Sequence, residues 1–139
     1  MTANCLCGAV RITIGTKPGF INDCNCSMCR KTGGAWGYFA PDTVTATGDT
    51  VAVQRSDKPA PAVEIHSCAS CGTTTHWVRT EAFIGQYGAN DLTGVNMRLF
   101  DPDALMGVEV HFPDGKNWTG EGPFAYRREA LTISETTRW

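Results

Sequence analysis

Hydrophobic and polar residues alternate along this chain in short runs that glycine, proline and aspartate separate. In the run 9–14, Val10, Ile12 and Ile14 would share one face of an extended strand. No window keeps apolar residues at helical spacing for more than two turns. Strand-like runs at intervals of roughly ten residues predict an all-β sandwich or barrel-like fold. The expected strands cover residues 9–14, 36–39, 44–47, 51–53, 63–67, 74–78, 95–100 and 108–112.

Turn and cap residues refine this prediction. Gly48 and Asp49 stand between the runs 44–47 and 51–53, which favours two strands paired through a tight turn. Asp101 followed by Pro102 is typical of a helix start, so we expect a helical turn over 101–106. A second helical turn is expected near Ser27, and the polar segment 55–61 is expected to be an exposed loop.

Length and composition exclude several classes of protein. A chain of 139 residues suits one domain, so we expect residues 1–139 to form a single one. A net charge of −2 without a basic run gives no surface for a nucleic-acid backbone. No apolar run approaches the roughly 20 residues that span a bilayer, which predicts no membrane partner. The start of the chain shows no export signal, so we expect a cytoplasmic protein.

The seven cysteines are the most informative residues, because they fall into three spaced groups. Cys68 and Cys71 form a C-x-x-C turn followed by glycine, which places two thiolates for one tetrahedral zinc. Cys5 and Cys7 form a C-x-C pair next to another predicted strand. We expect the two strand regions to pair, so that these four cysteines make a closed site.

The remaining group, Cys24, Cys26 and Cys29, offers three thiolates within six residues. Three protein ligands and one open position are typical of a catalytic zinc site. Thiolate ligands suit such a metal to a soft sulfur partner better than to making hydroxide from water, which points to a thiol substrate. The alternatives are one zinc with redox-active cysteines, or buried inert thiols.

These motifs together resemble the glutathione-dependent formaldehyde-activating enzyme family, whose domain also occurs in centromere protein V. The matching segments lie within residues 1–80: 5-CLCGAVR-11, 24-CNCSMCRKTGG-34 and 68-CASCGT-73. The resemblance implies a mainly β, Mss4-like fold with two zinc ions per chain, one structural and one catalytic. It implies a structural zinc on Cys5, Cys7, Cys68 and Cys71, and a catalytic zinc on Cys24, Cys26 and Cys29.

The resemblance also implies carbon–sulfur lyase chemistry that links glutathione and formaldehyde as S-hydroxymethylglutathione. Arg30 and Lys31 follow the central cysteines, so we expect them to bind the carboxylates of glutathione or to balance the anionic metal site. Asn25 is a departure, because the family often has histidine between the first two central cysteines. A zinc-stabilised binding module without turnover and a thiol-redox protein are the alternative functions.

Other candidate residues have simpler explanations. His66 would face the same side of its strand as Cys68, but four cysteines already complete a site. His76 could act as a general base only if it reached the open zinc. A histidine packed within a strand is the simpler interpretation. His111 is expected to face outward from its strand. The charged tail that ends in Trp139 leaves room for a homodimer contact.

Overall fold

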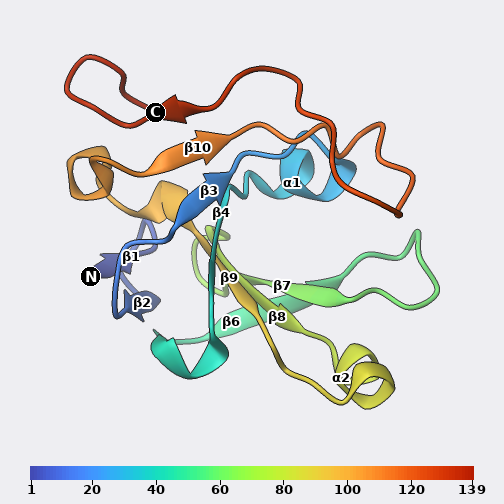
Figure 1. The fold of residues 1–139 in the computed structure, drawn as a ribbon. Helices are drawn as coiled ribbons and strands as arrows, with labels where there is room; N and C mark the ends of the chain where they lie inside the picture. The colour runs from blue at the N-terminus through green and yellow to red at the C-terminus, as the bar shows by residue number, and fades with distance from the viewer.

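The computed structural model describes residues 1–139, which form two β-sheets with few helices (Figure 1). The smaller sheet is antiparallel in the order β1-β2-β5. The larger sheet has the order β11-β10-β3-β4-β9-β8-β7-β6 and is antiparallel except between β10 and β3. The predicted mainly β fold is therefore confirmed. The strands are β1 (Thr2–Asn4), β2 (Arg11–Ile14), β3 (Phe20–Asn22), β4 (Trp36–Phe39), β5 (Val44–Thr47), β6 (Thr50–Gln54), β7 (Val63–Cys68), β8 (Thr74–Arg79), β9 (Thr93–Asn96), β10 (Glu109–His111) and β11 (Leu131–Thr132).

The helices are short, and none is long and apolar enough to cross a membrane. The helical turn predicted near Ser27 is α1, and the one predicted after Asp101 is a 3-10 helix, η3. Its cap is confirmed, since the Asp101 carboxylate accepts a hydrogen bond from the Asp103 N–H at 2.9 Å. The helices are α1 (Ser27–Thr32), α2 (Glu81–Tyr87), η1 (Pro41–Thr43), η2 (Met97–Leu99) and η3 (Pro102–Leu105).

The prediction that residues 44–47 and 51–53 pair with each other is wrong. β5 pairs with β2 in the smaller sheet, whereas β6 pairs with β7 at the edge of the larger one. The link between them crosses from one sheet to the other instead of folding back. Gly48 makes this passage with a φ of 97°, and a Cβ there would overlap the carbonyl oxygen of Ala9. A tight hairpin and a crossing between sheets use the same turn residues, so the sequence pattern did not separate them.

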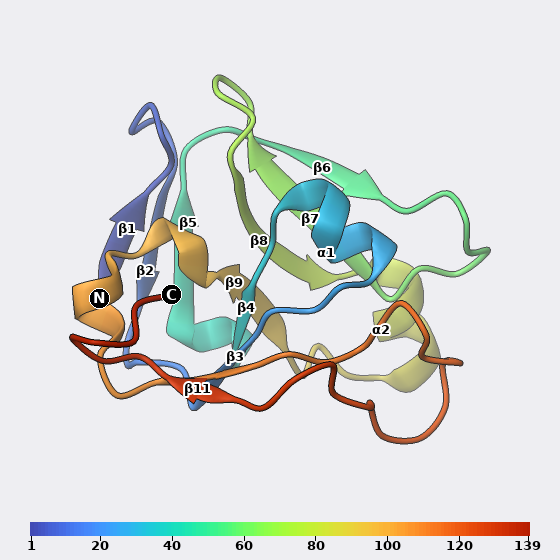
Figure 2. The same cartoon turned by 90° about the horizontal axis from the view of Figure 1, so that it is seen from above.

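The core divides into a large part and a small part, and the small part supports the candidate site. The large part includes Ile12, Val95 and Phe112, all nearly or completely buried. The small part lies under α1, where Cys29 packs with Trp77 and with two other buried side chains, Trp36 and Ile65. Figure 2 shows α1 above β7 and β8, with the small sheet to one side. α1 is thus fixed on the larger sheet by an apolar contact that includes one of its own cysteines.

Candidate functional site

Four cysteines meet where the two sheets approach each other. Cys5 and Cys7 lie in the loop after β1, Cys68 ends β7, and Cys71 lies in the turn to β8. Their sulfur atoms are within 4.8 Å of one another, with separations of 3.6 Å for Cys5–Cys7 and 3.8 Å for Cys7–Cys68. A tetrahedral zinc with Zn–S bonds of about 2.3 Å places its sulfurs about 3.8 Å apart. The group therefore fits a closed four-thiolate metal site.

The reason given from the sequence for this grouping is wrong, although the grouping itself is found. The predicted strands beside these cysteines do not pair, because β2 (within the predicted run 9–14) and β7 belong to different sheets. The loops meet instead through local contacts: the Leu6 N–H donates to the Thr73 hydroxyl at 3.3 Å. The Val10 N–H donates to the Cys5 sulfur at 3.2 Å, an orientation that favours a thiolate.

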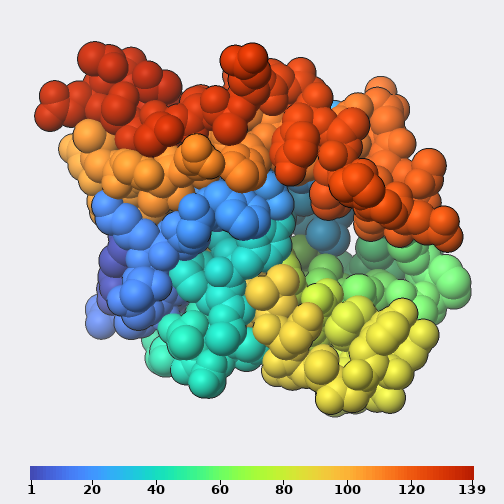
Figure 3. Space-filling model, viewed as in Figure 1, coloured from blue at the N-terminus to red at the C-terminus, as the bar shows by residue number.

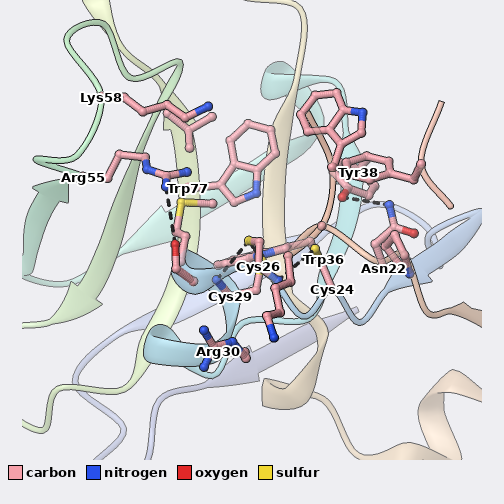
Figure 4. Close-up of a pocket in the computed structure, with 18 of the residues that line it drawn as sticks. Asn22, Cys24, Cys26, Cys29, Arg30, Trp36, Tyr38, Arg55, Lys58 and Trp77 are labelled. Carbon is pink, nitrogen blue, oxygen red and sulfur yellow. Dashed lines mark hydrogen bonds between the residues drawn. The ribbon is translucent and has the colours of Figure 1, made fainter. Parts of the chain in front are cut away.

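The other three cysteines gather at the start of α1. Their sulfur atoms also lie within 4.8 Å of one another, and Cys26 and Cys29 are 3.4 Å apart. Cys26 is the N-cap of the helix, and its sulfur accepts a hydrogen bond from the Cys29 N–H at 3.5 Å. The Trp36 indole N–H donates to the Cys29 sulfur at 3.3 Å. Helix capping and this indole contact together fix where the sulfurs lie (Figure 4).

The pKa values of these thiols show why the three-cysteine group suits a cation. Contacts with the Cys24 and Cys29 thiols lower the pKa of Cys26 to about 2. Contacts with Cys24 and Cys26 raise the pKa of the buried Cys29 thiol well above its usual value. Sulfurs this close cannot all ionise beside one another without a positive charge between them. The group could hold a metal with three ligands, and it contains no fourth metal-binding side chain.

A cavity of about 510 Å³ opens beside this group. Five arginine and lysine side chains line it, and no aspartate or glutamate does. Arg55 and Arg79 are paired with Asp57 at 2.6 Å and Asp91 at 2.9 Å, respectively. The other three cations make no salt bridge within the chain. These three are Arg30, Lys58 and Lys116.

Tyr38 on β4 adds a hydroxyl group to the cavity wall. The Asn22 side-chain amide donates to the Tyr38 oxygen at 3.0 Å, and Figure 4 shows the two side chains facing each other. Burial, above all, raises the pKa of Tyr38 to about 12. The phenol therefore keeps its proton at neutral pH, and its hydrogen is free for another acceptor.

The predicted cations beside the cysteines take different positions. Arg30 lines the cavity, and its Nε–H donates to the Asn25 carbonyl oxygen at 2.9 Å. Lys31 is exposed and lines a separate groove beside Val53 and Gln54. Of this pair, the structure brings only Arg30 to the cavity.

No histidine belongs to either cysteine group. His66 bonds the Thr50 hydroxyl at 2.9 Å and Glu64 at 3.3 Å. His76 is buried and stacks on His66 with ring centroids 4.5 Å apart, and burial lowers its pKa to about 4. Neither histidine lines the cavity. His111 is half-buried and lies 3.1 Å from Glu109.

A loop from the far end of the chain closes one side of the cavity, and sequence reasoning missed it. The Asn25 amide donates to Asp114 at 2.8 Å, and the Lys116 N–H donates to the Asn25 side-chain oxygen at 2.9 Å. Gly115 approaches so closely that a Cβ there would overlap the Cys24 sulfur. No sequence motif links residues about ninety positions apart; the only local signal was the polar Asn25 within the cysteine cluster.

Comparison with known proteins supports the assignment that the cysteine spacing suggested. A model of the glutathione-dependent formaldehyde-activating enzyme family matches residues 1–110. The chain belongs to this family. The family match includes all seven cysteines and ends before the loop that carries Gly115 and Lys116.

A likeness among solved structures supports the fold. The crystal structure of a Rhodobacter sphaeroides protein aligns with a TM-score of 0.57 at 24% sequence identity, covering 78% of this chain and 97% of that one. Comparison with curated proteins finds no match.

Proposed function

We propose that the protein is a zinc-dependent carbon–sulfur lyase of the formaldehyde-activating type that joins a small thiol, such as glutathione, to a carbonyl compound. The observation that carries this proposal is the three-cysteine group, which opens onto a cavity lined by cations without a carboxylate. Cys24, Cys26 and Cys29 would hold a catalytic zinc, and the four-cysteine group a structural one. A zinc ion with three thiolate ligands and an open position binds and exchanges a soft thiolate.

The proposed reaction needs no oxidant or reductant. The thiol sulfur forms a bond to the carbonyl carbon, and the carbonyl oxygen takes up the proton that the thiol loses. The product is an S-hydroxyalkyl thioether, which for glutathione and formaldehyde is S-hydroxymethylglutathione. The reverse reaction breaks the same carbon–sulfur bond. The protein's task is to hold the thiol beside the carbonyl group and to move one proton.

The side chains of the cavity suit these tasks. Arg30, Lys58 and Lys116 are free of salt bridges and would bind the carboxylates of the thiol. Tyr38 would donate its proton to the developing hydroxyl group, because its oxygen already accepts from Asn22 and its hydrogen is available. With its carboxylates on these cations and the carbonyl group beside Tyr38, the substrate would lie with its sulfur next to the three cysteines.

The first test counts zinc ions per chain. We expect two in the wild-type protein and one in Cys26→Ser, since the structure holds two separate cysteine groups. One zinc ion in both proteins would contradict a metal at the three-cysteine group.

The second test measures the exchange of glutathione and formaldehyde with S-hydroxymethylglutathione by NMR. We expect the zinc-loaded protein to accelerate the exchange and Cys26→Ser to lose this effect. Tyr38→Phe should lower the rate on the order of 100-fold, the usual contribution of a positioned proton donor. Tyr87→Phe is the matched control, because Tyr87 is exposed and lies outside the cavity. A protein that binds glutathione without accelerating the exchange would instead be a zinc-stabilised binding module.

A further inference from the structure

Two large aromatic side chains of the cavity wall stand partly in solvent. Trp118 is 39% exposed and Phe124 is 36% exposed, and their ring centroids are 4.6 Å apart. The Trp118 indole N–H donates to the Gly122 carbonyl oxygen at 3.0 Å, which closes the loop and holds the ring in place. Neighbouring aromatic rings left in water mark a surface that gains free energy from an apolar partner.

The rest of the cavity offers apolar surface as well. Met28, Val63 and Leu92 are half-buried and line it, together with the buried ring of Trp77. An apolar group inside the cavity would therefore contact apolar side chains of several elements and the two aromatic rings of the loop. A one-carbon formaldehyde unit is too small to contact this much surface.

The cations stand around this apolar interior. Figure 4 shows Arg55 and Lys58 on one side of the cysteines and Arg30 on the other. Figure 3 shows a hollow beside the orange-red segment that follows β10 and the green loop between β6 and β7, and both segments supply side chains to the cavity. Such an arrangement suits a ligand with anionic ends and an apolar body.

The aromatic loop is a feature of this chain beyond its family match. The match covers residues 1–110, which supply the cysteines, whereas Lys116, Trp118 and Phe124 follow it. The cysteines and most of the lining side chains thus lie within the match, whereas the loop that adds two aromatic rings and one cation lies outside it. The name of the family specifies formaldehyde, but the match to that family ends before the aromatic loop of this cavity.

We infer, on the basis of the proposed function, that the site acts on adducts of an anionic thiol with an aromatic or similarly large apolar aldehyde. The thiol sulfur bonds to the aldehyde carbon, and the aldehyde oxygen takes the thiol's proton to give a hemithioacetal. The carboxylates of the thiol face the cations, and the aldehyde's apolar group lies against Trp118 and Phe124.

Calorimetry with two stable thioethers on the zinc-loaded protein tests this inference. S-benzylglutathione carries an aromatic group on sulfur, and S-methylglutathione carries one carbon. We expect the benzyl compound to bind at least about tenfold more tightly, because its ring is removed from water. Trp118→Ala and Phe124→Ala should each reduce this ratio to about threefold or less, with little change for the methyl compound. Tyr87→Ala, at an exposed aromatic outside the cavity, should keep the full ratio.

The outcomes separate the substrate class from the activity. Equal binding of the two compounds by the wild-type protein, or an unchanged ratio in both cavity variants, would overturn the inference. If formaldehyde exchange is still accelerated in that case, the proposed function stands without it. If neither compound binds and no exchange is seen, the proposed function fails as well.

Discussion

Asn25 links the cysteine cluster to the loop that closes the cavity. Its side-chain amide donates to Asp114, and its side-chain oxygen accepts from the Lys116 N–H. An amide presents a donor and an acceptor side by side, whereas a neutral histidine separates them across its ring. The histidine that the family often has at this position would therefore not reproduce both contacts. Asn25 therefore positions the loop that contains Asp114 and Lys116, and we assign it no role in proton transfer.

Replacing Asn25 tests this positioning task. In Asn25→Ala the loop loses two hydrogen bonds, each worth on the order of 1 kcal/mol, so the affinity for S-methylglutathione should fall by up to about thirtyfold. Zinc content should not change, because the ligand cysteines are intact. Asn90→Ala is the control, since Asn90 is exposed and outside the cavity. Loss of a zinc ion in Asn25→Ala would show that the residue supports the metal ligands instead.

At the scale of the elements, strands with clear alternation were predictable and very short ones were not. β2, β7 and β8 follow from their own residues, whereas β1, β3 and β11 have two or three residues each and no visible period. Their extended form depends on the partner strand, which lies elsewhere in the chain. The short α2 was missed because its seven residues complete fewer than two turns and carry no motif, whereas the cysteine cluster marked the start of the equally short α1.

The candidate site also contains residues that the sequence predicts and residues that only the fold brings together. Each cysteine group is visible from its local spacing, because two or three ligands come from one turn. The cations Lys58 and Lys116 come from separate loops, and only the packing of the sheets brings them to one cavity. Tyr38 was visible as part of an aromatic strand, but its place beside Asn22 depends on the pairing of β3 with β4.

The paired strands β7 and β8 also predict a dependence of stability on pH. His76 on β8 is buried against His66 on β7, and burial lowers the pKa of His76 to about 4 from its usual 6.5. Between these values the unfolded chain binds a proton that the folded chain does not, so stability falls as the pH drops from about 6.5 to 4. In His76→Phe this contribution disappears, because phenylalanine does not titrate.

Chemical denaturation at pH 7.5 and pH 5 measures this effect. Relative to His76→Phe, the wild-type protein should lose about 1 to 2 kcal/mol more unfolding free energy over this range. Comparing the two proteins cancels the contribution of the cysteines, which both share. His76→Gln should match His76→Phe in its pH dependence. Equal losses in the wild-type protein and both variants would show that His76 titrates normally in the fold.

At the scale of the whole molecule, the two cysteine groups differ in what they join. The four-cysteine group connects the loop after β1 in the smaller sheet with the β7–β8 turn in the larger one. A metal there closes a chain segment of more than sixty residues and ties the sheets together. The three-cysteine group spans residues 24–29 and joins only the start of α1 to the residues before it.

Loss of one ligand from each group should therefore have unequal effects on stability. Cys5→Ser should lose one zinc ion and lower the melting temperature by about 10 °C or more, because the metal link between the sheets is lost and the buried Cys5 sulfur no longer contacts Cys7 and the Val10 N–H. Cys26→Ser should also lose one zinc ion but shift melting by only about 2–4 °C, since α1 stays packed through Cys29 and Trp77. Calorimetric melting with metal analysis on the same samples gives both quantities. Equal shifts would mean that the metal at α1 contributes as much to the fold as the metal between the sheets, and the division into a structural and a catalytic site would then be wrong.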